Sequence, residues 1–423
     1  TLRRDTAQMT TNTERYSFVP GATVDYPTIV DGDGIHLISS DGRRIIDAAA
    51  GAIVGNIGWG RTEPGEAAAA AMRMGYVVPT WPTPARLGLK EELAQHWLPE
   101  HMGNVFFTSG GSESTDSALR LARAYQVAKG RPDRWKVIGR HPSYHGMTTG
   151  TMAAASHSIR QKGYEPLLLP FPKVPWDDPE QVLKVIEQED PATIAGFIAE
   201  PITGAAGACL TASDDYWRTV TELCRKHDVL LIADEVMTGY GRTGLPFGHQ
   251  HFPFEPDVVV GGKGLGGGYM PLGAVATRGA VADTLRNAGF MFFTFSGNEA
   301  ACAAGCAVLQ IMRREGLVER SATMGALLGE RLRSAFGGHP HVIDIRGRGL
   351  FHGIELRCSK DTVVNNALER DLWVYPAGSG PVKDAIIVAP PFVITEAEID
   401  ELVTRLAASL RSEEHTSELQ SRL

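Results

Sequence analysis

The chain has 423 residues, 43% of them hydrophobic, and its 41 basic and 49 acidic side chains give a formal net charge of −8, so it is long enough for two or three domains and a large core. Because the basic residues form no stripe, nucleic acid and anionic membranes are poor partners. No apolar stretch approaches the roughly 20 residues of a membrane-spanning helix and no leader segment is recognisable, so we expect a cytoplasmic protein.

The N-terminal residues 1–64 contain short alternating segments that are typical of β-hairpins. Two such segments, 35–38 and 44–46, are bounded by the Asp-Gly pairs at 31–32, 33–34 and 41–42. Asp-Gly between alternating apolar residues is a strong hairpin signal. We therefore predict small antiparallel strands here, outside the main sheet.

Residues 65–325 alternate between apolar runs and segments of helical periodicity. The runs predict strands and the segments between them predict helices. Strands this uniformly apolar are covered on both faces, which indicates an α/β domain with a mostly parallel sheet flanked by helices. The predicted strands are 105–107, 137–138, 195–199, 229–233, 258–260 and 274–276, and the predicted helices are 114–128, 214–227 and 298–314.

The C-terminal residues 326–410 again mix helices with short strands. Strands are predicted at 342–345 and 351–356, with a final helix at 395–410. We expect 1–64 and 326–410 to build one smaller α+β domain around the central one. The end of the chain, residues 411–423, matches the translation of a common sequencing-library adapter, so we interpret it as a disordered, non-native tail.

The cysteines and histidines do not have the spacing of a metal site. The five cysteines form no CxxC pair, and Cys302 and Cys306 lie four apart on a predicted helix without a second pair or a histidine. The 13 histidines form no HExxH pattern. We expect reduced structural thiols and no bound metal.

Two side chains at predicted strand ends indicate cofactor chemistry. Lys263 stands among glycines just after the strand at 258–260, where desolvation would lower its pKa and make the amine a nucleophile. Asp234 ends the strand at 229–233, where a carboxylate could keep a pyridinium nitrogen protonated. Together they suggest pyridoxal phosphate (PLP), whose ring is an electron sink. Either residue alone could be ordinary, a solvated lysine or a turn aspartate.

The turn after the strand at 105–107 is a candidate phosphate site. It reads TSGGSES and enters a long helix, so the free N–H groups around Gly111 and Ser112 would point at an anion. A capped helix with flexible glycines is the alternative. No GxGxxG and no GK[ST] is present, which argues against a dinucleotide fold and a P-loop.

Residues that could hold a flat ring follow two other predicted strands. Tyr144, with His145 beside it, comes after the strand at 137–138, and Val236 comes just beyond Asp234. An aromatic and a branched side chain could press on the two faces of a heteroaromatic ring. A packed loop tyrosine is the alternative for Tyr144.

Several longer segments resemble the class III, or ω-, aminotransferases of PLP fold type I, collinear over about residues 32–395. They are SGGSESTDSALRLARAY, YHG, AEPITGAAG, LLIADEVMTGYGRTG, GGKGLGGGYMPLGAV and TFSGNEAACAAG. The resemblance implies that Lys263 carries the internal aldimine and that Asp234 meets the pyridine nitrogen. It also implies a set of further cofactor contacts: Gly111, Ser112, Tyr144, His145, Glu200 and Val236. Thr294 would reach the phosphate of the neighbouring subunit, so a homodimer with shared active sites is expected.

The implied activity is transfer of an amino group from a primary amine or ω-amino acid to a keto acid such as pyruvate, or to an aldehyde. The donor displaces Lys263, which then moves a proton from the donor carbon, and a second carbonyl compound completes a ping-pong cycle. The same fold also serves aminomutases, a decarboxylase and racemases. A regulatory protein that keeps the fold without turnover is the non-enzyme alternative, although no DNA-binding domain is seen.

Substrate residues are less clearly indicated. Many amine–pyruvate members have an arginine in the C-terminal segment that binds the acceptor carboxylate, and Glu396 stands in the corresponding stretch. A carboxylate entering an apolar pocket needs a cation, for which Arg86 is the first candidate and Arg348 the second. A surface or interface salt bridge is the alternative for Arg86, and packing is the alternative for the candidate pocket residues, Ile53, Trp59, Trp81 and Ala205.

Overall fold

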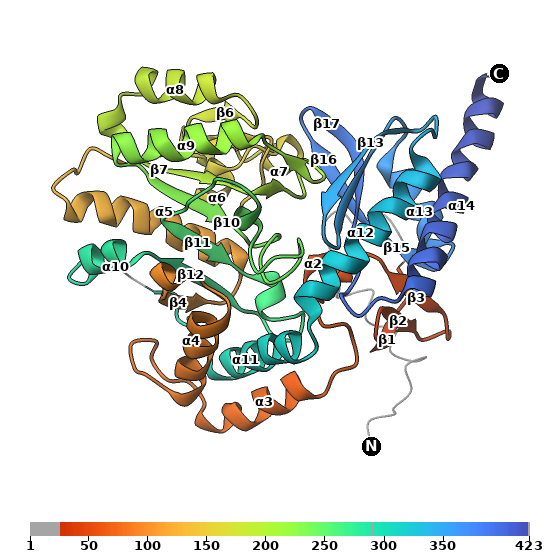
Figure 1. Cartoon of the computed structure of the whole chain (residues 1–423), viewed down its shortest axis with the longest axis horizontal. Helices are drawn as coiled ribbons and strands as arrows, with labels where there is room; N and C mark the ends of the chain where they lie inside the picture. Colours follow the sequence, from red (N-terminus) through yellow and green to blue (C-terminus); the bar gives the residue numbers. More distant parts are fainter. Residues whose placement is uncertain (1–25, 289–291, 422–423) are drawn as a thin grey trace.

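The computed structural model describes residues 26–288 and 292–421, with side chains to Leu410. Figure 1 shows a larger part on the left, built around one central sheet, and a smaller part on the right, where the first strands and the last helix of the chain lie together. The expected division into a large α/β domain and a small α+β domain from both chain ends is therefore confirmed as architecture.

The central sheet has seven strands in the order β4-β12-β11-β10-β7-β5-β6. Only β12 runs antiparallel to its neighbours, so the sheet is mostly parallel, as predicted. The predicted strands coincide with observed ones to within a few residues. The bounds are β4 Asn104–Thr108, β5 Lys136–His141, β6 Lys173–Pro175, β7 Ile194–Ala199, β10 Leu230–Asp234, β11 Val258–Gly261 and β12 Gly273–Thr277.

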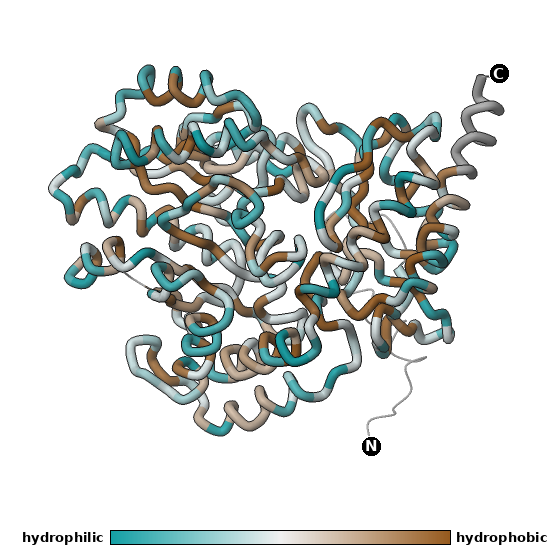
Figure 2. Tube along the Cα trace, in the orientation of Figure 1, coloured by the Kyte–Doolittle hydropathy of each residue, from teal (hydrophilic) through white to brown (hydrophobic). Residues whose placement is uncertain are grey.

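Alternate residues of β10 face opposite helical layers. Leu230 and Ile232 pack with α5 (Gly111–Ala128), whereas Leu231 and Ala233 belong to the core that contains α9 (Asp214–His227). Because both faces are covered, the strand is apolar throughout. Figure 2 shows the same pattern, with hydrophobic strands inside and hydrophilic outer helices. Further helices around this sheet are α3 Glu63–Ala71, α4 Pro84–His96, α8 Pro179–Gln188, α10 Gly279–Leu285 and α11 Glu299–Arg314.

Local sequence explains where the predicted helices begin. The Ser213 hydroxyl accepts a hydrogen bond from the Tyr216 N–H at 3.2 Å and caps α9, which has the predicted bounds. Asn298 caps α11 through the Ala301 N–H at 3.2 Å. In contrast, α5 starts three residues earlier than predicted, directly after Gly110 and without a side-chain cap.

The smaller part contains two sheets. In the first, β15 from the C-terminal region pairs in parallel with β3, so both chain ends meet in one sheet of order β1-β2-β3-β15. The prediction of a turn at Asp31-Gly32 is wrong, because Gly32 pairs with Leu37 inside a strand. The bounds are β1 Ile29–Asp33, β2 His36–Ser39, β3 Arg44–Asp47 and β15 Leu372–Trp373, and for the second sheet β13 Val342–Arg348, β14 Phe351–Leu356, β16 Tyr375–Ser379 and β17 Val382–Val388.

Three helices complete the smaller part, α12 (Leu317–Phe336), α13 (Lys360–Leu368) and α14 (Glu396–Ser421). The proposed boundary between 325 and 326 lies inside α12, which packs on α14 and β13, so we now propose a domain limit just before α12. The prediction of disorder after residue 410 is wrong for the backbone up to Ser421, because α14 continues to that residue. That stretch contains no Pro or Gly to end a helix.

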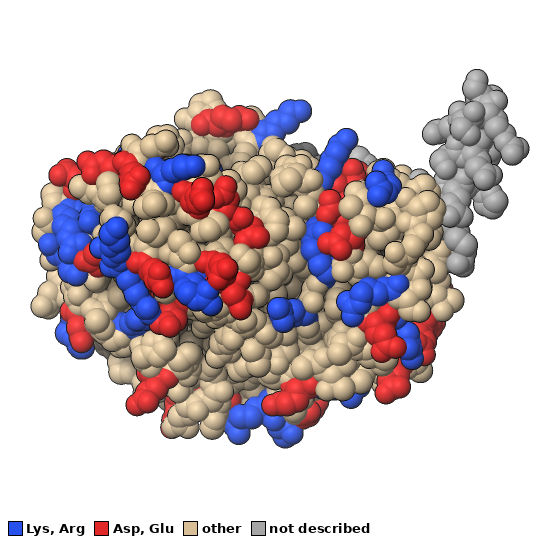
Figure 3. Space-filling model, turned by 45° about the horizontal axis from the view of Figure 1, so that its top comes forward, with Lys and Arg blue, Asp and Glu red and all other residues tan. Residues whose placement is uncertain are grey.

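Shorter elements lie between these strands and helices along the chain. They are α2 Ala50–Ile53, α6 Thr149–Ala154, α7 Ser158–Gln161, β8 Ile202–Thr203 and β9 Leu210–Thr211. The surface view in Figure 3 shows basic and acidic residues interspersed, without a stripe of one sign on this face. Across residues 26–288 and 292–421, every helix is too short or too polar to cross a bilayer.

Candidate active site

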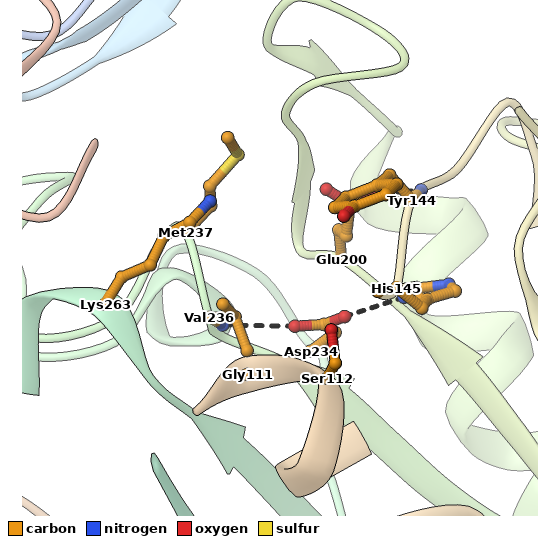
Figure 4. A pocket seen from close by; sticks show the side chains of 10 residues that line it. Gly111, Ser112, Tyr144, His145, Glu200, Asp234, Val236, Met237 and Lys263 are labelled. Carbon is orange, nitrogen blue, oxygen red and sulfur yellow. Dashed lines mark hydrogen bonds and ion pairs between the residues drawn. The ribbon is translucent and has the colours of Figure 1, made fainter. Parts of the chain in front are cut away.

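A pocket lies where β10, β7 and β5 end and where α5 begins (Figure 4). This is the sheet edge at which ligands of such folds bind. Of the predicted cofactor residues, the structure brings all but Thr294 to this pocket. The lining residues are Gly111, Ser112, Tyr144, His145, Gly146, Glu200, Asp234, Val236, Met237 and Lys263.

Asp234 is fixed at the centre of the pocket by hydrogen bonds to both carboxylate oxygens. Its Oδ2 lies 2.7 Å from Nδ1 of His145, and its Oδ1 accepts from the Val236 N–H at 3.1 Å. Asp234 is only 4% exposed. The contact to a carboxylate defines Nδ1 as the protonated nitrogen of His145, and Nε2 has no hydrogen-bond partner within the described structure. A buried carboxylate held this firmly can pair with a cationic group of a ligand.

Lys263 enters from the opposite side to Tyr144, with Asp234 between them (Figure 4). It follows β11, which pairs with β10 so that Val260 is opposite Asp234. The left-handed φ of 44° at Lys263 is unusual for a residue with a side chain and turns the chain at this point. Burial lowers the pKa of the Lys263 amine to about 8, against the opposing effect of the Asp234 and Glu200 charges.

The beginning of α5 supplies an anion site. The cap residue Gly110 contributes no side-chain hydrogen bond, so the N–H groups of the first turn, at Gly111 and Ser112, remain available to a ligand. A Cβ on Gly111 would lie 2.7 Å from Cγ1 of Val236. Only glycine at position 111 therefore allows this turn to come this close to Val236, which lies just beyond Asp234 in the chain.

Glu200 is a buried carboxylate at the end of β7. Its two oxygens accept hydrogen bonds from the N–H groups of Tyr144 at 3.0 Å and Gly204 at 2.9 Å. Burial raises the pKa of Glu200, and the nearby Asp234 charge acts in the same direction while His145 opposes it. Glu200 thus fixes the backbone that presents the Tyr144 ring to the pocket.

The candidate residues for the substrate do not line this pocket. Trp81 is 67% exposed, and the indole N–H of Trp59 is used by Asp47 at 3.0 Å. Ile53 and Ala205 are buried in an apolar cluster that also contains Met237. They are therefore neighbours of a lining residue without lining the pocket themselves.

Arg86 is buried and forms a salt bridge within the chain, whereas the alternative expected from the sequence was a surface or interface salt bridge. Its Nη2 lies 3.1 Å from Glu299 Oε1, and the remaining N–H groups donate to backbone oxygens. These acceptors are the carbonyls of Val77, Val78, Trp81 and Gly297. This arrangement leaves Arg86 no donor for an acceptor carboxylate, so we do not retain that role.

Thr294 is exposed in the turn before α11, away from the pocket of its own chain. Its expected contact to a neighbouring subunit stays a prediction. The second arginine candidate, Arg348, is exposed at the end of β13, where its guanidinium carbon lies 5.5 Å from the centroid of the Phe252 ring. Neither Arg348 nor Phe252 lines the pocket, so we do not retain a carboxylate role for Arg348.

Two lining residues, Gly146 and Met237, were not selected from the sequence. Gly146 has a φ of 127°, and a Cβ there would lie 2.6 Å from Ser112 Oγ. Its place in the Tyr-His-Gly motif was a signal that could have identified it. Met237 has no comparable signal, since only the fold shows that it reaches the pocket. Across the described residues, no group of three His, Cys, Asp or Glu side chains could hold a metal ion.

Comparison with known proteins agrees with this fold and pocket. The family model for class III aminotransferases matches residues 21–410. An uncharacterized aminotransferase of Bacillus subtilis is 35% identical over 415 residues, which cover 90% of this chain and 91% of that protein. The putrescine–pyruvate aminotransferase of Pseudomonas aeruginosa is 33% identical over 405 residues, with 89% and 88% covered. The chain therefore belongs to the class III aminotransferase family and is an aminotransferase.

A solved structure of a transaminase has the same fold. An (S)-enantioselective omega-transaminase from Thermomicrobium roseum superposes with a TM-score of 0.88 at 32% identity, covering 97% of this chain and 99% of that one. The architecture is thus that of the transaminases, and the pocket described above lies within it.

Proposed function

We propose that this aminotransferase uses PLP to move an amino group from a primary amine or ω-amino acid to a keto acid such as pyruvate, with ping-pong kinetics. The observation that carries the proposal is the position of the Lys263 amine across one pocket from the Asp234–His145 pair. Transamination needs both a nucleophilic amine and a carboxylate that can keep the ring nitrogen of the cofactor protonated.

The pocket fits the cofactor in three respects. The uncapped start of α5 can hold a phosphate through the N–H groups of Gly111 and Ser112. Val236 and Tyr144 provide apolar and aromatic surface beside Asp234, whose carboxylate can pair with a pyridinium nitrogen. When bound, PLP supplies an electron sink for the carbanion that forms at the substrate carbon.

We assign the proton transfers to Lys263. With a pKa near 8, a substantial fraction of the amine is neutral close to neutral pH, so it can accept a proton and return it. Glu200, whose pKa burial raises, stays in place as the anchor of the Tyr144 backbone. Asp234 would pair with the ring nitrogen of the bound cofactor, and His145 keeps the Asp234 carboxylate oriented.

We also propose that the protein forms a homodimer whose active sites are shared between the two subunits. Large exposed apolar side chains gather in 72–87 and 292–295, and the rings of Tyr76 and Phe295 meet edge to face at 6.1 Å. A patch of this kind marks a protein interface. Thr294 lies within it, which supports a contact to the partner's phosphate site. The exposed residues are Met72, Met74, Tyr76, Trp81, Leu87, Phe292 and Phe295.

The relative that acts on putrescine and pyruvate supports an amine donor and a keto-acid acceptor. The test is an incubation of PLP-loaded protein with a primary amine and pyruvate, followed by quantification of both products. We expect one equivalent of aldehyde or ketone for each alanine, and no product with Lys263→Ala. Release of carbon dioxide, racemised donor or isomerised amine without alanine would instead favour the decarboxylase, racemase or aminomutase alternatives.

A further inference from the structure

Several arginines of the fold have their guanidinium groups engaged within the protein. In addition to Arg86, the Arg140 guanidinium donates to the Glu200 carbonyl at 2.5 Å and to Thr203 Oγ1 at 2.9 Å. Arg242 and Arg346 donate to backbone carbonyls at 2.7–3.0 Å. A ligand carboxylate would have to compete with these intramolecular bonds, so these arginines are poor candidates for substrate binding.

Arg160 is different because its guanidinium lies on an aromatic ring. It belongs to α7, and its Cζ lies 4.4 Å from the centroid of the Tyr144 ring, which lines the pocket. Burial raises the pKa of Tyr144, and the charge of Arg160 together with a hydrogen bond from its guanidinium to the phenol opposes this rise. Stacking uses the face of a guanidinium, so the edge N–H groups that the phenol does not take can bind a carboxylate.

The charge of Arg160 acts on two neighbouring titratable groups. Burial lowers the pKa of His157 to about 4, and the charges of Arg160 and Lys360 act in the same direction. The charge of Arg160 also contributes to the lowered pKa of Lys263. The electric field of Arg160 therefore reaches the Lys263 amine, to which we assign the proton transfers. Lys360 is already engaged, since its Nζ donates to the Ala377 carbonyl at 3.0 Å.

We propose that Arg160 binds the carboxylate of the keto-acid acceptor at the pocket, with the Tyr144 ring as the platform beneath its guanidinium. The proposal rests on the transaminase function above and deepens it by naming the residue that distinguishes a keto acid from an uncharged aldehyde. A carboxylate in a largely apolar pocket needs a cation. Arg160 takes the role first considered for Arg86, whose donors are occupied.

The test compares two acceptors in two arginine variants. Arg160→Gln removes the charge, and Arg348→Gln is the matched control, because Arg348 is also an arginine over an aromatic ring. With one amine donor, we expect Arg160→Gln to raise the KM for pyruvate about tenfold or more while the KM for propanal changes little. Arg160→Lys should retain part of the pyruvate selectivity, and Arg348→Gln should resemble the unmodified protein with both acceptors.

A second measurement does not depend on turnover. Calorimetric binding of propanoate, an unreactive carboxylate, should weaken in Arg160→Gln and remain unchanged in Arg348→Gln. Equal changes in KM for pyruvate and propanal, or unchanged propanoate binding in Arg160→Gln, would overturn the assignment of Arg160. If the unmodified protein transfers nitrogen to neither acceptor, the proposed function itself fails, which is a separate result.

Discussion

His145 and Asp234 form a buried pair in which Nδ1 of the imidazole lies 2.7 Å from Oδ2 of the carboxylate. The second oxygen of Asp234 is held by the Val236 N–H. The aspartate therefore has one fixed orientation in the pocket, and its charge can act on a ligand without reorganisation at the moment of reaction.

Replacing the charge of Asp234 should affect turnover much more than folding. In Asp234→Asn the side chain keeps its size but cannot hold a ring nitrogen protonated, so we expect kcat to fall by about a hundredfold or more. Steady-state kinetics with a saturating amine and pyruvate would measure this, with the circular dichroism spectrum as the control for folding. A variant with near-normal kcat would contradict the role of Asp234.

The His145 contact should matter through the orientation of Asp234. His145→Ala leaves Oδ2 without this partner, and we expect about a tenfold loss of kcat. His145→Asn is the matched variant, since its amide N–H can replace the Nδ1 donor, and it should retain more activity. Equal losses in the two variants would indicate that the imidazole has another function.

The strands and most of the residues that line the pocket could be predicted because each leaves a local signal. Strands covered on both faces are apolar throughout, and Asp234 and Lys263 follow two of them that proved to be neighbours. The Ser213 cap likewise explains why the bounds of α9 were predictable. The apolar strands, the residues at their ends and the helix cap each depend on a short segment of sequence. Such segments have similar neighbours in every sheet of this kind.

The errors concern residues whose environment is created by distant segments. Arg86 resembles a ligand-binding arginine in sequence, but Glu299 and several carbonyls bind it in the fold. Met237 reaches the pocket only because of how the chain turns after β10. The Asp-Gly pair at 31–32 has the composition of a turn, yet pairing with β2 holds it in a strand.

Arg86 should prove to be a structural residue. Arg86→Ala leaves Glu299 buried without its cation, which should lower the free energy of unfolding by about 3–5 kcal/mol. Urea unfolding would measure this, and Arg348→Ala at an exposed position provides the control. The KM values for pyruvate and an aldehyde should change together. A selective increase for pyruvate would restore the carboxylate role.

Arg242 and Asn56 should stabilise the contact between the two parts of the molecule. Arg242 donates to the carbonyls of Leu350 and Pro390 and to Asn56 Oδ1, the last at 2.7 Å. We expect Arg242→Met to lower the free energy of unfolding by about 3 kcal/mol. In a double-mutant cycle with Asn56→Ala, a coupling energy of about 1 kcal/mol or more is expected. Additive effects would show that this hydrogen bond contributes little.

The reactivity of Lys263 should depend on pH in the direction set by its surroundings. Burial lowers the pKa of this amine from 10.5 to about 8, so the neutral form should accumulate as the pH rises through about 8. In protein freed of cofactor, the rate of covalent attachment of added PLP, trapped by borohydride, should therefore increase with a midpoint near that pH. The charges of Asp234 and Glu200 oppose the lowering, so Asp234→Asn should move the midpoint to lower pH. Glu200→Gln should do the same in a second, independent variant. A midpoint near that of a free lysine, a shift to higher pH in either variant, or labelling of another lysine would show that Lys263 is not the buried nucleophile of this pocket.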